Sequence, residues 1–525
     1  MKKILKSNWV LLLIIGLAIF MRYWQITALP GGLFPDEAAN GLDINRMFQG
    51  EIQPFYERGN GREALFFYFL AAAVALFGRG PWQHHIISGG FGVVAVLVTY
   101  FLAKRMFGKR VALLATFFMA VGSYAVTISR TAFRANTVPL FATLTLLFLV
   151  KFFQTEDKKT KYWSAAWSGL FFSLGFYTYT SFRMMVPLLI GFGFLLFFGN
   201  RAKARGLFQT YTKYKIVFAA AFLLGFSWLG IYFIQHPGSI VGRAGQVSVF
   251  NPELNKGDVI GTTIEVSKAT ILSFFTDGDL NWRHNVSGHP LLSPFLSPFF
   301  AGALILFTVS LFILLKQVWH QNIKSQTVFQ ALIACWFWLM LVPEVTTAEG
   351  IPHGLRLIGV MPAIFILTAF GVNWVWEKFT SHKPLHWPQY YFATLFLLVV
   401  FMYNFALYFV VAAGSADYYY AFRSDLTDVS NYLNARNLKT RTYLSLDKFS
   451  VQTTDYLTTE KNQPYILVDP AHTFEIELKR GDQVVFTMST LFDRIKFLEY
   501  HPHVKLIRED RNQFGEIIML VYEQI

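Results

Sequence analysis

Long apolar runs recur along most of this chain, and they constrain its fold more than any other feature. A helix needs roughly 17–25 mostly apolar residues to cross the hydrocarbon core of a membrane. The runs are Trp9 to Met21, His84 to Leu102, Val111 to Ser129, Thr137 to Phe153, Ser164 to Thr180, Met184 to Phe198, Ile216 to Ile234, Phe295 to Leu315, Val328 to Val342, Leu357 to Trp376 and Tyr391 to Val411. Because a single soluble core cannot absorb so much apolar surface, they predict a polytopic α-helical membrane protein with about eleven transmembrane helices.

The charge distribution supports this fold class and predicts an orientation. Only 15% of the residues are charged, against about 25% in soluble domains. The lysines and arginines behind the net charge of +14 gather in short links between apolar runs, which indicates membrane topology rather than nucleic-acid binding. By the positive-inside rule, the cytoplasmic links are Lys2 to Lys6, Lys104 to Arg110, Lys158 to Lys161, Arg201 to Lys215, Lys316 to Lys324 and Lys378 to Lys383.

This alternation holds only if the apolar segment Glu63 to Phe77 does not cross, so we assign it to a juxtamembrane or re-entrant helix. Everything after about Ala413 is then extracytoplasmic. Strand-like segments follow there, at Thr442 to Leu446, Tyr465 to Val468, Gln483 to Thr487 and Ile517 to Tyr522. The predicted domains are a transmembrane domain over 1–413, with juxtamembrane helices in its first external loop, and an extracytoplasmic α/β domain over 414–525.

The first external loop is rich in ionisable residues. It contains Asp36 and Glu37, then Glu57, Arg62 and Glu63. Ionisable groups near membrane depth are candidates for function. The alternative for the Asp-Glu pair is helix-start chemistry, because Pro35 suits the first helical position and carboxylates complement the positive end of the helix dipole.

Three other external loops carry arginine rather than lysine. They contain Arg130, then Tyr177 and Tyr179 with Arg183, then His353 with Arg356. The planar guanidinium pairs with phosphate oxygens in bidentate fashion, which lysine cannot do. The loops therefore predict a phosphate-bearing ligand at the outer face. The alternative is that each arginine snorkels or pairs with a loop carboxylate.

The loop from His236 to Ser293 contains Asp277-Gly278-Asp279, followed by Arg283, His284 and Asn285. The Asp-x-Asp pattern is typical of a metal-binding element in nucleotide-sugar enzymes, and Asp-Gly-Asp is also common turn chemistry. The single cysteine, Cys335, excludes an intrachain disulfide and a cysteine-based metal centre. The sequence thus assigns no definite cofactor and leaves room for a divalent metal ion.

Together these residues resemble the GT-C glycosyltransferases, in the branch that contains protein O-mannosyltransferases and the lipid A aminoarabinose transferase. The resemblance extends from about residue 10 to residue 370. It is carried by the Asp-Glu pair after the first helix, Arg62-Glu63, Ser129-Arg130, Tyr177-Thr178-Tyr179 with Arg183, Gly278-Asp279 with Arg283-His284-Asn285, and Pro352-His353 with Arg356. A histidine pair, His84-His85, stands where arginine is common in the family.

The resemblance implies a donor sugar on polyprenyl phosphate and a catalytic carboxylate in the first external loop. Asp36 is then the leading catalytic residue, with Glu37 and Glu63 as supporting candidates. The residues expected to bind the donor phosphate are Arg183, His353, Arg356 and Arg130. Those expected to contact the acceptor or the donor sugar are Tyr177, Tyr179, Glu57, Arg62, Asp279, Arg283, His284 and Asn285.

The predicted function is transfer of a hexose or pentose to an acceptor hydroxyl of a protein, lipid or glycan, at the outer face of the plasma or inner membrane. Direct displacement would invert the anomeric centre. One alternative is a transporter or lipid flippase, in which ionisable residues would lie near span centres. Others are a polymerase or ligase of lipid-linked glycans and a non-catalytic scaffold.

Overall fold

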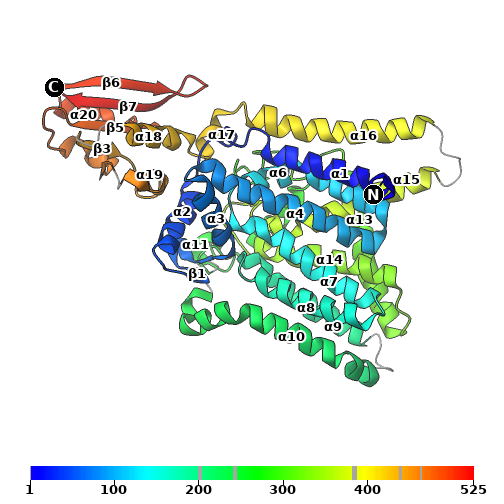
Figure 1. Cartoon of the computed structure of the whole chain (residues 1–525). Coiled ribbons are helices and arrows are strands. Elements are labelled where there is room, and N and C mark those ends of the chain that lie inside the picture. Colours follow the sequence, from blue (N-terminus) through cyan, green and yellow to red (C-terminus); the bar gives the residue numbers. More distant parts are fainter. Residues whose placement is uncertain (1, 199–203, 241–244, 381–386, 437–439, 462–463) are drawn as a thin grey trace. The chain divides into compact units, whose positions relative to one another are not determined.

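The computed structural model describes the chain except for residues 1, 199–203, 241–244, 381–386, 437–439 and 462–463 (Figure 1). The chain divides into two compact units, each assembled from separate segments. Unit 1 holds residues 1–24, 53–66 and 87–411, and unit 2 holds residues 25–52, 67–86 and 412–525. The loop that follows α1 (Lys2–Tyr23), predicted to be the first external loop, therefore contributes to both units.

The predicted apolar runs fall largely within helices. These are α1 (Lys2–Tyr23), α4 (Pro81–Phe107), α5 (Lys109–Val121), α6 (Ser123–Arg130), α7 (Val138–Gln154), α8 (Lys158–Gly175), α9 (Met185–Phe198), α10 (Ala204–Gln235), α13 (Ser297–Trp319), α14 (Ser325–Val345), α15 (Met361–Thr380) and α16 (Trp387–Ala406). Among the described residues, seven helices are long and apolar enough to cross a membrane, or eight if α5 and α6 form one span. The chain is therefore a multi-span helical membrane protein, whereas the expected count of eleven is not confirmed.

The predicted span Val111 to Ser129 is broken into two helices. The axes of α5 and α6 differ by 56°. Gly122 lies between them with extended backbone, and a Cβ there would approach the Phe365 ring to 2.9 Å. The glycine thus permits a close approach to α15 at the bend. All residues of α6 are buried, so its last turn, with Ser129 and Arg130, lies inside unit 1.

Apolar helices too short to span also occur. The helix α3 (Leu65–Phe77) has 13 residues, fewer than the roughly 17 that a crossing requires. This length agrees with its assignment as a juxtamembrane helix, and the topology itself stays a prediction. Two further helices, α11 (Pro252–Asn255) and α12 (Val259–Leu272), lie in the loop between α10 and α13.

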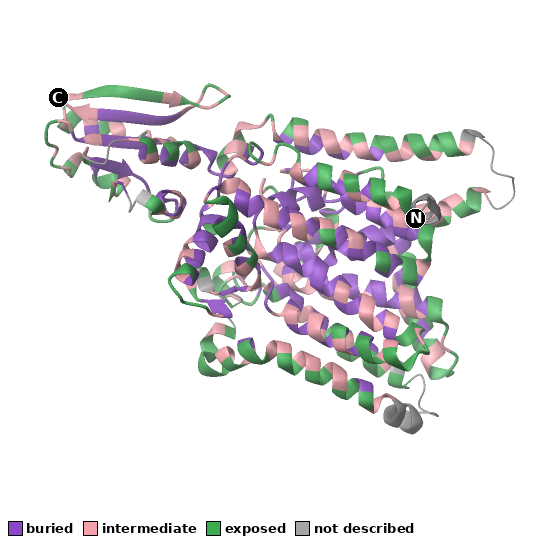
Figure 2. Ribbon diagram, in the orientation of Figure 1, coloured by how far each residue is buried: buried purple, intermediate pink, exposed green. Residues whose placement is uncertain are grey.

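The core of unit 1 is formed by helices that bury small and aromatic side chains against one another. The helix α5 packs on α15, α13 packs on α14 and α15, and α8 lies between α7 and α10 (Figure 1). Buried residues run along these inner helices in Figure 2. Trp336 is fully buried, and its indole N–H donates to the carbonyl of Gly359 at 3.0 Å. This bond ties α14 to the segment that precedes α15.

The helix α10 has the opposite character. Only 6% of its most apolar window is buried, and Leu224 and Ile234 are each 81% exposed. Exposing so continuous an apolar face to water is unfavourable, whereas the hydrocarbon of a membrane solvates it. Its exposed side chains therefore face lipid.

Unit 2 contains a five-stranded mixed sheet in the order β4-β3-β5-β7-β6, as the predicted C-terminal α/β domain requires. Its strands are β3 (Thr442–Ser445), β4 (Ile466–Val468), β5 (Gln483–Thr487), β6 (Val504–Arg511) and β7 (Ile517–Gln524). The strand β3 pairs in parallel with β4 and with the central strand β5, and β7 pairs antiparallel with β5 and β6. The accompanying helices are α17 (Ala416–Ala421), α18 (Ser424–Ala435), α19 (Val451–Thr458) and α20 (Arg494–Tyr500).

The same unit includes α2 (Pro35–Phe48), the helix of the predicted first external loop that carries Asp36 and Glu37. It packs on α19. The Thr453 hydroxyl donates to the carbonyl of Leu33 at 2.9 Å, just before α2 begins. A Cβ at Gly41 would lie 2.4 Å from the Tyr456 ring, so only glycine permits this approach of the two helices. The C-terminal domain thus holds the first-loop helix.

Candidate functional site

Several loops of unit 1, which the sequence predicts to be external, meet in a cluster of polar side chains. Its carboxylate Glu63 lies on the two-residue strand β2 (Arg62–Glu63), which pairs with β1 (Phe55–Tyr56). Arg134, in the short helix η2 (Arg134–Thr137), lies with its Nε 3.0 Å from Glu63 Oε2. The Arg134 guanidinium also lies over the Tyr179 ring, 5.3 Å from its centre. Three of the loops predicted to carry chemistry are therefore in contact.

A second group in unit 1 joins the two later loops. His284 Nδ1 lies 2.9 Å from Asp279 Oδ2, and the same oxygen accepts a hydrogen bond of 2.7 Å from the backbone N–H of Gly354. The rings of His284 and His353 lie 4.4 Å apart. The segments 276–296 and 346–355 thus approach each other through Asp279, and its other oxygen accepts from the N–H of Asn281.

Glu344 near the end of α14 also belongs to this group, and the sequence analysis gave it no role. It is fully buried, and its Oε1 accepts from the backbone N–H of His353 at 2.8 Å. Its Oε2 lies 3.7 Å from Arg356 Nη1, which donates to the carbonyl of Glu349 at 2.5 Å. The sequence feature that could have identified Glu344 is its position as a carboxylate directly after an apolar run that ends at Pro343.

Electrostatic interactions connect the two groups at Tyr179. Burial raises the pKa of this phenol above its usual value. Arg134 and Arg356 lower the pKa of Tyr179, while Glu63 and Glu344 raise it, so charges from both groups act on one hydroxyl. Tyr179 therefore stays protonated at neutral pH and can donate a hydrogen bond.

Burial also determines the charge of both histidines. It lowers the pKa of His284, and the hydrogen bond with Asp279 opposes that shift. Burial is again the first cause for His353, whose pKa lies well below the usual value, with His284 and Arg356 acting in the same direction. Both imidazoles are thus neutral at pH 7, the state that binds metals. Asp279, His284 and His353 are the described residues that could hold a metal ion.

Arg130 and Arg183, both predicted to bind phosphate, make contacts elsewhere. Fully buried Arg130 donates to the carbonyl of Trp24 and to the Tyr408 hydroxyl, at 2.9 and 3.1 Å. Arg183, in η3 (Thr180–Met184), donates to the carbonyl of Ile240 at 2.6 Å. None of these partners belongs to the group around Asp279 and Glu344. Arg356, in contrast, lies beside Glu344 of that group.

Some of the residues expected to contact sugar form local bonds. The Tyr177 hydroxyl donates to the carbonyl of Gly225 and accepts from the N–H of Leu229, which joins its loop to α10. The Glu57 carboxylate accepts from the Tyr232 hydroxyl, and the Arg62 side chain donates to the carbonyl of Arg58. The carbonyl of Arg283 accepts from the Thr131 hydroxyl, and the Asn285 side chain donates to the carbonyl of His289. These bonds shape the loops that carry the site.

In unit 2, the two carboxylates of the Asp-Glu pair differ sharply. Glu37 is fully buried: its Oε2 accepts from the N–H of Phe34 at 3.0 Å, and its Oε1 lies 3.3 Å from Nε2 of His85. Next to it, His84 Nε2 lies 2.9 Å from the Tyr456 hydroxyl. Asp36, by contrast, is exposed in the first turn of α2. The helix start is thus made by Glu37, and Asp36 is the member of the pair that a substrate can reach.

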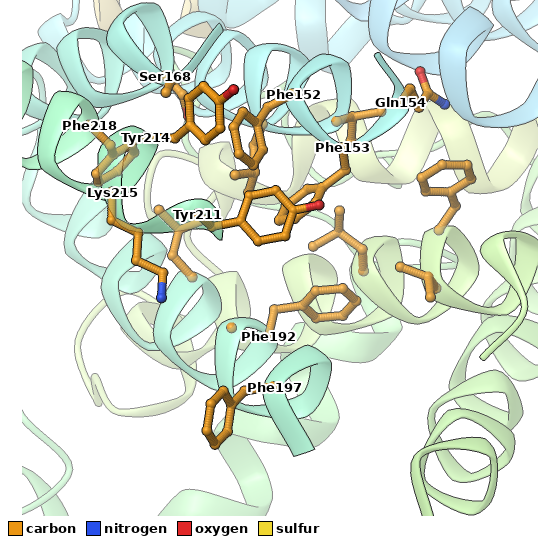
Figure 3. A pocket seen from close by; sticks show the side chains of 18 of the residues that line it. Phe152, Phe153, Gln154, Ser168, Phe192, Phe197, Tyr211, Tyr214, Lys215 and Phe218 are labelled. Carbon is orange, nitrogen blue, oxygen red and sulfur yellow. The ribbon is translucent and has the colours of Figure 1, made fainter. Parts of the chain in front are cut away.

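An apolar cavity of about 660 Å³ in unit 1 shares no residue with the polar cluster. It lies among α7, α8, α9, α10 and α14, and the rings of Phe152, Tyr211 and Phe192 line it (Figure 3). Its polar lining residues are Lys215 within α10 and Gln154 at the end of α7, together with serines and tyrosines. Apolar side chains form most of its lining, and none of the described residues that line it carries a carboxylate.

A family model described as dolichyl-phosphate-mannose-protein mannosyltransferase matches residues 64–230. No curated protein sequence matches the chain. Among solved structures, ArnT from Cupriavidus metallidurans bound to undecaprenyl phosphate is similar with a TM-score of 0.57 and 13% identity, over 98% of each chain. The oligosaccharyltransferase of Archaeoglobus fulgidus tethered with an acceptor peptide is similar with a TM-score of 0.52 and 11% identity, over 98% of this chain and 74% of that one.

A second structure of the archaeal protein, AglB in complex with an inhibitory peptide and a dolichol-phosphate, has a TM-score of 0.50 and 12% identity. It covers 98% of this chain and 74% of that chain. These neighbours are all glycosyltransferases with one membrane fold, the GT-C fold, and the described helices of this chain follow it.

Proposed function

We propose that this chain is a GT-C glycosyltransferase and that it transfers a single sugar from a polyprenyl-phosphate donor to an acceptor hydroxyl, with inversion. The observation that carries the proposal is the polar cluster of unit 1, where separate loops bring arginines, carboxylates and Tyr179 together. Two structural neighbours are bound to undecaprenyl phosphate and dolichol-phosphate, which supports a lipid-linked donor here.

The proposed reaction is a single displacement. The acceptor oxygen forms a bond to the anomeric carbon as the bond from that carbon to the phosphate oxygen breaks. The hydroxyl proton passes to Asp36, and the bonding electron pair leaves with the polyprenyl phosphate. Arg356 stabilises the negative charge on that phosphate, since a guanidinium fork matches two of its oxygens.

The match of residues 64–230 to a mannosyltransferase family model argues against the transporter or flippase and the scaffold. A polymerase or ligase of lipid-linked glycans is the second candidate, because one structural neighbour is an oligosaccharyltransferase. The two candidates differ in the donor, which carries one sugar in the first and a glycan in the second.

An assay with defined donors tests the proposal. We expect purified wild-type protein to consume polyprenyl phosphate carrying one labelled sugar and to release polyprenyl phosphate as the label moves to acceptor. Membrane extract supplies the mixed acceptors, and Asp36→Asn protein is the control for contaminating enzymes. Consumption of polyprenyl-linked oligosaccharide alone would contradict the proposal and favour the polymerase or ligase.

The proposed location of the site outside the cytoplasm predicts the topology of the chain. A peptide tag after Ile525 should react with a membrane-impermeant label on intact cells, because unit 2 would lie outside. A tag between Lys158 and Lys161, in a predicted cytoplasmic link, should react only after permeabilisation and serves as the control. If the C-terminal tag also required permeabilisation, the proposed orientation would be wrong.

A further inference from the structure

We propose that Asp279, His284 and His353 bind one divalent transition-metal ion. Each of these residues offers one ligand atom within 4.8 Å of the others. Ligand atoms on a tetrahedral zinc ion lie roughly 3.3–3.5 Å apart, as metal-ligand bonds of about 2.0–2.2 Å require. His284 Nδ1 and Asp279 Oδ2 lie 2.9 Å apart, so the three side chains are already gathered within a small adjustment of the spacing that such an ion requires.

One orphaned atom points to a ligand that the protein does not itself supply. His353 Nδ1 is buried and has no hydrogen-bond partner. Buried polar atoms are nearly always paired, because leaving one without a partner costs free energy. The hydrogen bond between His284 and Asp279 explains those two residues as a structural pair, but it leaves the Nδ1 atom of His353 without a role. A bound metal ion satisfies all three.

The surrounding contacts would hold the ligands in place. Asp279 accepts from the N–H groups of Asn281 and Gly354, both at 2.7 Å. Glu344 accepts from the backbone N–H of His353, and the Tyr124 hydroxyl donates to the carbonyl of Gly354 at 2.5 Å. Such outer contacts orient metal ligands and usually change metal affinity about 10–100-fold when removed.

The ligand types identify the class of ion. Two imidazole nitrogens and one carboxylate oxygen suit zinc, manganese and iron, whereas calcium and magnesium prefer oxygen ligands alone. Three protein ligands leave a coordination position for water or substrate. The Asp277-Gly278-Asp279 pattern thus contributes one ligand rather than two, and its partners come from outside the motif.

Metal titration of the whole protein tests the site without any transfer assay, so it is independent of the proposed function. We expect chelator-treated wild-type protein in detergent to bind one equivalent of Zn²⁺, measured by calorimetry and by metal content after gel filtration. His353→Gln and Asp279→Asn should each lower Zn²⁺ affinity at least 10-fold. His289→Gln, in the same loop but outside the group, is the matched control and should bind as wild type does.

Equal Zn²⁺ binding by wild type and both variants would overturn the proposal, as would the absence of binding to wild type. A variant that fails to fold does not block the test, because Co²⁺ reports on the wild-type protein directly. Tetrahedral Co²⁺ with nitrogen and oxygen ligands absorbs visible light far more strongly than aqueous Co²⁺. We expect these absorption bands at one equivalent, and the spectrum of aqueous Co²⁺ alone would contradict the site.

Discussion

Replacing Asp36 by asparagine is expected to lower the rate of sugar transfer by about 10²–10⁴-fold, the usual contribution of a general base. Asparagine is nearly isosteric and also suits a helix start, so α2 should remain intact. The structure strengthens this expectation, because Glu37 makes the hydrogen bond that closes the start of the helix, while Asp36 is exposed. Single-turnover transfer from labelled donor measures the rate, and copurified lipid-linked sugar reports donor binding.

Glu37→Gln provides the matched comparison. Its carboxylate is buried beside His85, so that substitution should lower the thermal stability of the protein, which Asp36→Asn should leave almost unchanged. Transfer by Asp36→Asn within about threefold of wild type would reject a base that normally contributes at least about 10²-fold, and would direct attention to Glu37 or Glu63.

Removal of the Arg356 side chain should weaken donor binding by roughly 10–100-fold. A hydrogen bond to a charged group is worth about 1.5–3 kcal/mol, and each 1.4 kcal/mol changes a binding constant about tenfold. Arg356→Lys keeps the charge and loses the planar fork, so its affinity should lie between those of wild type and Arg356→Ala. Equilibrium binding of a fluorescent polyprenyl phosphate measures the three affinities.

The neighbouring carboxylate requires its own control. Arg356→Ala leaves the buried Glu344 without the guanidinium 3.7 Å away, and a buried charge deprived of its partner destabilises a fold. The double variant Arg356→Ala with Glu344→Gln removes both charges, so its stability should recover while donor affinity remains low. Wild-type affinity in Arg356→Lys and Arg356→Ala would instead assign the arginine to structure.

Much of the fold could be predicted because a helix that crosses the hydrocarbon core of a membrane must consist of a long run of apolar residues. Long apolar runs identified the helices. Hydropathy does not register the bend at Gly122, because the run stays apolar across the break, where the glycine packs closely against Phe365. The strand β6 was missed for the opposite reason. It lies at the sheet edge, and most of its residues are exposed, so it lacks the alternation of a half-buried strand.

The candidate site could be predicted only as far as residue type and loop position allow. Arginine among outer loops singled out Arg356, but the same pattern singled out Arg130, which lies buried against Tyr408 and Trp24. The sequence shows that an arginine is present in each loop. It does not show whether the guanidinium points toward a ligand or donates to a carbonyl of the same chain. Glu344 was missed because it directly follows an apolar run. At that position, a functional carboxylate looks the same in the sequence as an ordinary polar residue at the end of a helix.

The packing of α2 on α19 has a consequence for how the protein is made. Thr453 and Leu33 are 420 positions apart, and His84 and Tyr456 are 372 apart. Synthesis proceeds from the N-terminus, so α2 is made long before the helix that holds it. During that interval the nascent chain lacks these contacts, and the helix that carries Asp36 acquires them only after α19 has been made and has folded. The first loop is therefore assembled late, by contacts with a helix made several hundred residues after it.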